Sequence, residues 1–217
     1  MSKDQESLSR DLASGVLGLL PFGSVFELVS SRLITAVQAE HQRNTSKAMA
    51  ATERASGLSR WDLQERIADN PNLVPLLTHV LFTAGMTGFD DVLESMGQVL
   101  GDAVRDPTSA DDAAVVLTAM APLRGHHTKV LRVLTRDRPL HGAEGEEPKK
   151  VHWSIPTISP EAGLSEDISG LCVAGLVNAG LVRTLMTFDR PGYEITELGK
   201  TVLEAIEARQ QAKTRRS

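Results

Sequence analysis

The chain has 217 residues, of which 41% are hydrophobic and 24% are charged, and its net charge is −5. A chain of this length and composition is an ordinary globular protein that can bury one large core or two small ones. Only 4% of the residues are aromatic, so the core must consist mainly of aliphatic side chains. The net charge excludes a strongly basic protein that binds nucleic acid through charge alone.

The charge differs between the two parts of the chain. Residues 1–121 carry 9 Lys and Arg against 16 Asp and Glu, which leaves −7, whereas residues 122–217 carry 14 against 12, which leaves +2. The first part should repel nucleic acid and acidic membranes, and the second is close to neutral with local basic spots. We expect a helical domain over 1–121 and a second domain over 122–217.

The sequence predicts a cytoplasmic protein that does not cross a membrane. Its one cysteine, Cys172, excludes an internal disulfide and is typical of a reducing compartment. Residues 1–11 mix acidic and basic side chains, unlike a signal peptide. The uncharged stretch 12–26 is shorter than the ~20 residues that span a bilayer, and Pro21 interrupts it. We expect a buried hairpin or helix pair there, with a membrane-touching segment as the alternative.

Apolar residues recur at helical spacing through the first part of the chain. The pattern predicts a long helix from Phe22 to about Arg54 and then, without a strand, helices over 60–68, 71–85, 89–106, 110–123 and 126–140. Trp61 is the expected aromatic anchor of the second helix. The expected N-terminal caps are Ser59, Asn70 and Ser109.

The pattern changes after the polar stretch 141–150, which we expect to be an exposed loop. Residues 151–155 alternate between apolar and polar side chains, which predicts a strand. This strand should pair with residues 181–188 in a small three-stranded sheet and should bury Trp153.

The remaining elements are a helix, a hairpin and a final helix. Ser165 should cap the first helix, and Gly180 should end it. Two strands should flank the turn at 189–192, and Thr196 should cap the last helix. The residues of the first helix that we expect to face inward are Ile168, Leu171, Cys172, Leu176 and Val177.

Three consecutive stretches resemble MarR-like and PadR-like bacterial regulators: "LVNAGLV" at 176–182, "RTLMTFDRPGYEI" at 183–195 and "TELGKTVLEAI" at 196–206. In that family a helix ends in Gly-Leu-Val, a β-hairpin wing follows, and Thr-Glu-x-Gly opens the next helix. The resemblance implies a winged-helix fold and a regulator that binds DNA.

Two further stretches, "LPFGSVFEL" at 20–28 and "APLRGHHTKVLRVL" at 121–134, resemble Abi-alpha-like helical proteins. Those proteins are associated with phage defence. This second resemblance implies a helical first part and a role in phage defence or prophage biology.

The sequence departs from the DNA-binding pattern of the winged-helix family in two ways. The family has a short helix just before the recognition helix, but here only "SPEAG" at 159–163 is available, enough for one turn. The expected recognition helix has no Lys, Arg or Gln, and its first turn carries Glu166 and Asp167. Base edges and phosphates are contacted mainly by Arg, Lys, Asn and Gln, and Asn178 lies at the wrong end.

The sequence predicts no catalytic, cofactor or metal site. The side chains of His126 and His127 should diverge by ~100° on a helix, so they do not suit one metal ion. Cys172 lies on a predicted apolar face and should be a buried, inert thiol. No phosphate-binding loop, Gly-x-Ser-x-Gly motif or dinucleotide fingerprint occurs. We therefore expect a protein that is not an enzyme.

The predicted fold is mainly α: an N-terminal multi-helix bundle followed by a winged-helix-like α+β module with a small antiparallel sheet. The preferred function is a non-enzymatic regulatory protein that uses the winged-helix scaffold for contacts with a protein partner, and the sequence leaves a homo-oligomer open. The alternative is a DNA-binding transcriptional regulator that contacts phosphates through Lys149, Lys150, Arg183 and Arg190.

Overall fold

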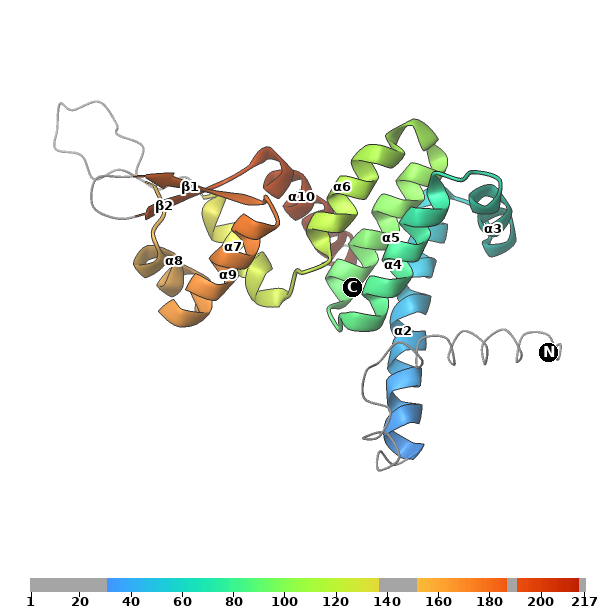
Figure 1. Ribbon diagram of the computed structural model, residues 1–217, viewed down its shortest axis with the longest axis horizontal. Coiled ribbons are helices and arrows are strands. Elements are labelled where there is room, and N and C mark those ends of the chain that lie inside the picture. The colour runs from blue at the N-terminus through green and yellow to red at the C-terminus, as the bar shows by residue number, and fades with distance from the viewer. Residues whose placement is uncertain (1–30, 137–151, 187–190, 215–217) are drawn as a thin grey trace. The chain divides into compact units, whose positions relative to one another are not determined.

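The computed structural model describes residues 31–136, 152–186 and 191–214 (Figure 1). Residues 41–217 cluster into one compact unit and residues 1–40 into another, of which only the start of helix α2 is described. The described part is mainly α-helical with one small antiparallel sheet, as the sequence predicts. Two predicted features, the stretch 12–26 and the loop 141–150, lie outside the described residues.

The first part of the described chain is built from helices joined by short turns. They are α2 (Ser31–Ser56), α3 (Arg60–Ala68), α4 (Leu73–Met86), α5 (Asp90–Arg105), the single 3-10 turn η2 (Pro107–Ser109) and α6 (Ala110–Met120). Ser59 caps α3 as predicted, because its side chain accepts a hydrogen bond from the Asp62 amide. The prediction for Asn70 was wrong: its side chain accepts from the Asn72 amide in a turn, and α4 begins after Asn72.

Helix α5 packs against α4, α6 and the C-terminal helix α10 (Glu197–Thr214). Of the apolar residues that recur at helical spacing in α5, Val99 is half-buried and the others are buried: Val92, Leu93, Met96 and Leu100. The helix ends at Arg105, directly before Asp106 and Pro107, where the sequence predicts its end. Its burial places α5 in a hydrophobic core that runs without a break from α2 to α10 among the described residues.

Two glycines allow α5 to lie unusually close to α2. A Cβ atom at Gly97 would stand 2.2 Å from the carbonyl oxygen of Ala48, and one at Gly101 would stand 2.7 Å from that of Thr52. No side chain fits into so short a distance from backbone atoms. The four-residue spacing of the glycines puts both on one face of α5, so the two helices meet backbone to backbone along this line.

The prediction that Trp61 anchors its helix was wrong, because this side chain is 75% exposed. Helix α3 has nine residues and buries only Leu63 and Ile67, which are four positions apart and so share a face. Trp61 lies two positions before Leu63, about 200° around the helix, and therefore points away from the core.

The second part of the described chain contains α7 (Gly125–Leu134), α8 (Ile155–Ala162), α9 (Glu166–Asn178), β1 (Val182–Met186), β2 (Pro191–Ile195) and α10. The two strands pair antiparallel, with Val182 opposite Ile195 and Leu185 opposite Gly192. This hairpin between two helices agrees with the predicted order. Residues 187–190 lie outside the described residues, and β2 begins at Pro191, inside the stretch 189–192 that was predicted as a turn.

The predicted strand at 151–155 was wrong. Among the described residues only Trp153 pairs, through a single bridge in which the Tyr193 amide donates to the Trp153 carbonyl over 2.8 Å. The partner is therefore β2 rather than β1, the sheet has two strands, and the Trp153 side chain is half-buried. Ile155 already belongs to α8, because Ser154 and Thr157 form a capping box there and Pro156 suits a first helical turn.

The same helix corrects the expectation that residues 159–163 form a single turn. Helix α8 has eight residues and ends at Gly163, whose positive φ of 64° closes it in the left-handed conformation. Leu164 and Ser165 then lead directly into α9, so a short helix does precede α9. This removes one of the two departures from the winged-helix pattern.

Helix α10 contacts both predicted domains. It packs against α7 and also against α5 and α6, and the Ser95 hydroxyl on α5 donates to the Ala205 carbonyl over 3.1 Å. Val202 and Ile206, which are four positions apart and so share a face, are fully buried. The domain boundary between residues 121 and 122 stays a prediction. If the two predicted domains separated, the contacts of α10 with α5 and α6 would be lost.

Candidate interaction surface

The inward side of α9 is set by four buried residues. Ser165 caps the helix as predicted, with its side chain accepting from the Ile168 amide. The buried residues of the helix follow the spacing of one helical face, and they are Ser169, Cys172, Val173 and Leu176. Two predicted inward residues were wrong, because Ile168 is 40% exposed and Leu171 is 71% exposed.

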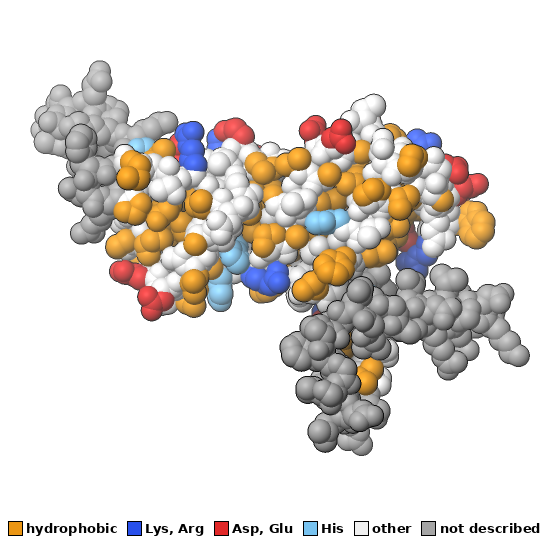
Figure 2. Space-filling model, viewed as in Figure 1, with side chains coloured by type: hydrophobic (Ala, Val, Ile, Leu, Met, Phe, Trp, Pro, Cys, Tyr) orange, Lys and Arg blue, Asp and Glu red, His pale blue; other side chains and the backbone are white. Residues whose placement is uncertain are grey.

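The outward side of α9 is acidic at its start and apolar along its length. We define the α9 face by the exposed residues Glu166, Asp167, Ile168, Leu171, Ala174 and Asn178. Asp167, Leu171, Ala174 and Asn178 repeat at four, three and four positions, which places them in one line opposite the buried side. Figure 2 shows acidic side chains beside hydrophobic ones over α8 and α9. No residue of α9 carries a positive charge.

The residues that carry the winged-helix resemblance have structural reasons for their presence. The Thr196 hydroxyl donates to the Gly180 carbonyl over 2.8 Å and accepts from the Gly199 amide over 3.0 Å, so it caps α10 as predicted. A Cβ at Gly199 would stand 2.2 Å from the Leu181 carbonyl oxygen. Thr196 and Gly199 of the Thr-Glu-x-Gly motif therefore join α10 to the segment that follows α9.

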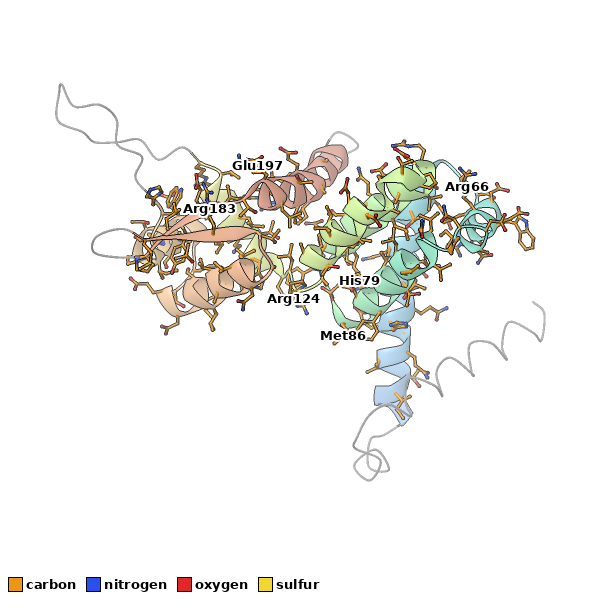
Figure 3. All side chains as sticks on the ribbon, turned by 45° about the horizontal axis from the view of Figure 1, so that its top comes forward. Arg66, His79, Met86, Arg124, Arg183 and Glu197 are labelled. Atoms are coloured by element: carbon orange, nitrogen blue, oxygen red, sulfur yellow. The ribbon has the colours of Figure 1, made fainter. Side chains whose placement is uncertain are left out.

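Among the predicted phosphate-binding residues, the structure places only Arg183. Its guanidinium forms an ion pair with the Glu194 carboxylate directly across the hairpin, and Nε donates to that carboxylate over 2.8 Å. Figure 3 shows Arg183 on the hairpin and Glu197 at the start of α10. Lys149, Lys150 and Arg190 lie outside the described residues. The pairing leaves Arg183 with little net positive field for a phosphate.

Other basic side chains of this region are paired in the same way. The ion pairs are Arg132 with Glu207, Arg136 with Glu161, and Lys200 with Glu197. The hydrogen bond and charge of Glu197 raise the pKa of Lys200, which holds its ammonium group charged against that carboxylate. Carboxylates therefore hold these three side chains, whereas Arg124 donates to the Leu123 carbonyl and Lys129 is exposed.

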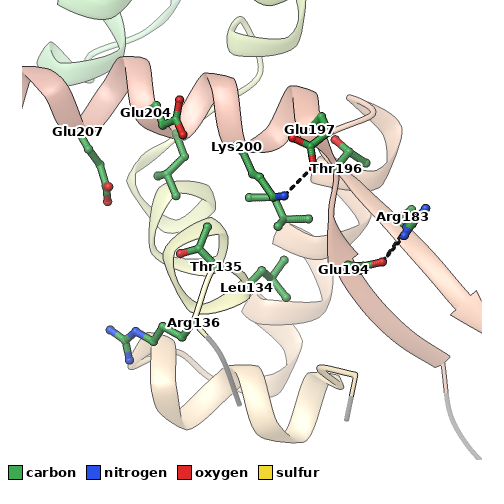
Figure 4. Close-up of a pocket in the computed structure, with 12 residues that line it drawn as sticks. Leu134, Thr135, Arg136, Arg183, Glu194, Thr196, Glu197, Lys200, Glu204 and Glu207 are labelled. Atoms are coloured by element: carbon green, nitrogen blue, oxygen red, sulfur yellow. Dashed lines mark hydrogen bonds and ion pairs between the residues drawn. The ribbon is translucent and has the colours of Figure 1, made fainter. Parts of the chain in front are cut away.

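An open hollow of about 610 Å³ lies where α7, β2 and α10 meet (Figure 4). Its lining mixes both signs of charge: Arg136, Arg183 and Lys200 against Glu194, Glu197, Glu204 and Glu207. No histidine or cysteine is among the residues that line it. The three positive and four negative side chains nearly balance, so the hollow does not concentrate a strong field of one sign.

The histidines and the cysteine have structural surroundings. His127 lies partly buried against α9, and its Nδ1 accepts from the Arg124 amide over 3.1 Å, whereas His126 is exposed. Burial lowers the pKa of His127, and the charge of Arg124 adds to this effect. Cys172 is buried as predicted, and burial raises the pKa of its thiol. The part of the chain that the structure describes holds no cluster of three metal-binding side chains.

The comparisons with known proteins leave the family open. No protein-family model matches the chain, and neither a curated protein nor a solved structure matches it. Within the described ranges, no helix combines the length and the apolar composition needed to cross a bilayer.

Proposed function

We propose that the protein is a non-enzymatic cytoplasmic regulator that binds another protein through the α9 face, on a winged-helix scaffold. The observation that carries the proposal is the composition of that face, which is apolar at Leu171, Ile168 and Ala174 and acidic at Glu166 and Asp167. A solvent-exposed apolar strip with a charged end is typical of a protein contact.

The same face is poorly suited to a DNA groove. A recognition helix contacts base edges with residues near its N-terminal end, and here that end carries Glu166 and Asp167. Both carboxylates would approach phosphates, and like charges in close contact repel. Arg183 is held by Glu194 and so does not offset this repulsion.

The chemistry of the α9 face indicates the chemistry of its partner. Apolar side chains of the partner would cover Leu171 and Ile168, which removes exposed hydrophobic area from water. One or more Lys or Arg side chains would meet Glu166 and Asp167. We therefore expect a partner surface that is apolar in its centre and basic at one edge, and an association rate that falls as salt rises.

The alternative function is a DNA-binding regulator, and one observation favours it. Helix α8 lies directly before α9 and packs against it, which is the arrangement of a helix-turn-helix. Under this alternative the wing residue Arg190, with Lys149 and Lys150, would supply the phosphate contacts. Substituting Arg190 by Ala would then weaken binding at all sequences alike and lower the salt slope by about one.

A fluorescence anisotropy titration of the full chain against mixed genomic DNA distinguishes the two functions. At low salt and at physiological salt, we expect no binding below micromolar protein concentrations. Salt-dependent submicromolar binding that weakens in Arg190→Ala would overturn the proposal in favour of the DNA-binding regulator.

A two-step experiment tests the α9 face itself. A protein that binds the chain is first captured from cell extract by crosslinking, and its affinity for wild-type and variant chains is then measured. We expect Leu171→Glu to weaken this binding at least about tenfold, because it puts a charge at the centre of an apolar contact. Trp61→Glu is the matched control, since Trp61 is a similarly exposed apolar residue on α3. Equal binding by both variants would contradict a role for α9.

A further inference from the structure

Helix α4 is apolar on its outer side as well as on its inner side. None of its 14 residues is Asp, Glu, Lys or Arg. Its inner side buries Leu73, Leu76, Val80 and Ala84. On its outer side Phe82 is 69% exposed and Met86 is 68% exposed. A helix on the surface of a globular protein normally carries polar or charged residues on that side, so the outer side of α4 calls for a partner.

We define the α4 face by the exposed residues Val74, Thr78, Phe82 and Met86 of α4 and Val115 and Thr118 of the neighbouring helix α6. The four residues of α4 lie at intervals of four and so follow one line along the helix. Helix α6 packs against α4, and Nε2 of His79 lies 3.3 Å from the Leu117 carbonyl oxygen. Hydrophobic side chains gather over both helices in Figure 2.

The two helices run in the same direction. His79 in the middle of α4 lies beside Leu117 of α6, and Phe89, just after α4, contacts Gly125, just after α6. Figure 3 shows Met86 and Arg124 at this same end. The opposite end of α6 carries the exposed carboxylates Asp111 and Asp112. The face is therefore neutral in its middle and acidic at one end, and at the other end lies the half-buried Arg124, whose guanidinium donates to the Leu123 carbonyl over 2.8 Å.

We propose that the α4 face binds a second copy of this chain across a two-fold axis. A two-fold contact places each residue patch against the same patch of the partner, so a charged centre would repel itself. The centre of the α4 face is uncharged. When two such faces meet antiparallel, Asp111 and Asp112 of each copy lie toward Arg124 of the other.

The α9 face does not fit this occupant. Two copies that met through α9 would bring their own Glu166 and Asp167 carboxylates together near an apolar contact, which is unfavourable. The charge pattern therefore assigns different occupants to the two faces: a second copy to α4 and a basic partner to α9. The α4 proposal does not depend on the proposed function.

The size of the α4 face sets the strength of the dimer. A helix of 14 residues is about 21 Å long, and helices pack about 8–10 Å apart. Stable interfaces bury about 800 Å² on each partner, more than one such pair of helices alone supplies. Val115 and Thr118 of α6 must therefore contribute to the contact. Even with them, we expect an interface that is small for a stable dimer. We therefore expect a dimer that dissociates on dilution into the micromolar range.

Sedimentation equilibrium of the full chain over a wide concentration range tests the proposal. The wild-type mass should rise from the monomer value of 23.4 kDa toward twice that value as concentration increases. Phe82→Glu and Met86→Glu should each raise the dissociation constant at least about tenfold, because each buries two like charges at the two-fold contact. Leu171→Glu on α9 is the matched control and should leave it unchanged.

The thermal unfolding midpoint of each variant shows whether it still folds. If a charged variant does not fold, Phe82→Gln replaces it as a milder, uncharged change at the same contact. A chain that stays monomeric at high concentration would overturn the proposal. So would a dimer that persists in both folded charged variants, or one that Leu171→Glu disrupts equally.

Discussion

The bundle of α2 to α6 and the module of α7 to α10 are stabilised in different ways. In the bundle, small residues let α2 and α5 meet backbone to backbone at Gly97 and Gly101. In the module, a hydroxyl cap at Thr196 and cross-element ion pairs such as that of Arg183 join the elements. Gly199 makes a similarly close contact in the module, and Lys47 of α2 pairs with Asp90 of α5 in the bundle, so the clearest difference is the hydroxyl cap of Thr196. Adding a methyl group should therefore destabilise the bundle at Gly97, and removing a hydroxyl should destabilise the module at Thr196.

The largest effect is expected for Gly97→Ala in the bundle. The added Cβ would meet the Ala48 carbonyl at 2.2 Å, so α2 and α5 must separate. Overpacking costs about 1–3 kcal/mol, and the better helix propensity of Ala recovers at most about 1 kcal/mol. Gly170→Ala on α9 is the matched control, since it has open space around it and should stabilise the protein. Urea unfolding of both variants measures the difference, and equal changes would contradict the close helix contact.

A smaller loss is expected for Thr196→Val in the module. This change keeps the shape of the side chain but removes the hydroxyl that caps α10 and binds the Gly180 carbonyl. Loss of a cap with its hydrogen bonds costs about 1–2 kcal/mol. Thr196→Ser keeps the hydroxyl and should remain close to wild type in the same urea unfolding experiment. If Thr196→Ser loses as much stability as Thr196→Val, the hydroxyl alone does not account for the role of this residue.

The module should also respond to pH through His127, between α7 and α9. Burial lowers the pKa of His127 below its usual 6.5 in the folded protein, and Arg124 and His126 add to the effect. The unfolded chain then binds a proton at a higher pH than the folded one. Stability should be full above that usual pKa and should fall as pH decreases through it. Unfolding measured on both sides of that pKa should show a smaller decrease in His127→Gln than in wild type.

The smallest effect is expected for Arg183→Ala on the hairpin. This arginine is largely exposed, and an exposed ion pair contributes about 0–1 kcal/mol. A double-mutant cycle with Glu194→Gln should give a coupling in that range, and added salt should reduce it. A coupling of several kcal/mol would show that charges hold the module as strongly as close packing holds the bundle.

Sequence periodicity predicted those helices whose two sides differ. Val92, Leu93, Met96 and Leu100 of α5 alternate with polar residues, so their burial could be read directly. In α4 the apolar residues that repeat at three and four positions include Leu73, Leu76 and Val80, which are buried, and Phe82 lies outside this pattern. The periodicity therefore predicts the inner side of this helix, but it does not predict that the outer side is also apolar.

The errors at α8 and α9 have local causes. Alternation over residues 151–155 indicated a strand, but the capping box of Ser154 and Thr157 starts a helix in the middle of that segment. On α9 the inward side includes the polar residue Ser169. A count of apolar residues alone therefore assigned Leu171 to the buried side by mistake. Treating Ser169 as buried would have aligned it with Cys172, Val173 and Leu176 and exposed Leu171.

The path of α10 bears on how this protein can be dissected. The N-terminal end of this helix is fixed to the hairpin through Thr196 and Gly199, and its later turns fill the surface of α5 through Val202 and Ile206. A fragment cut after residue 121 would expose the part of α5 that α10 covers, including Ser95. A fragment designed for crystallisation or labelling should therefore carry residues 196–206 in trans as a peptide, or keep the chain whole.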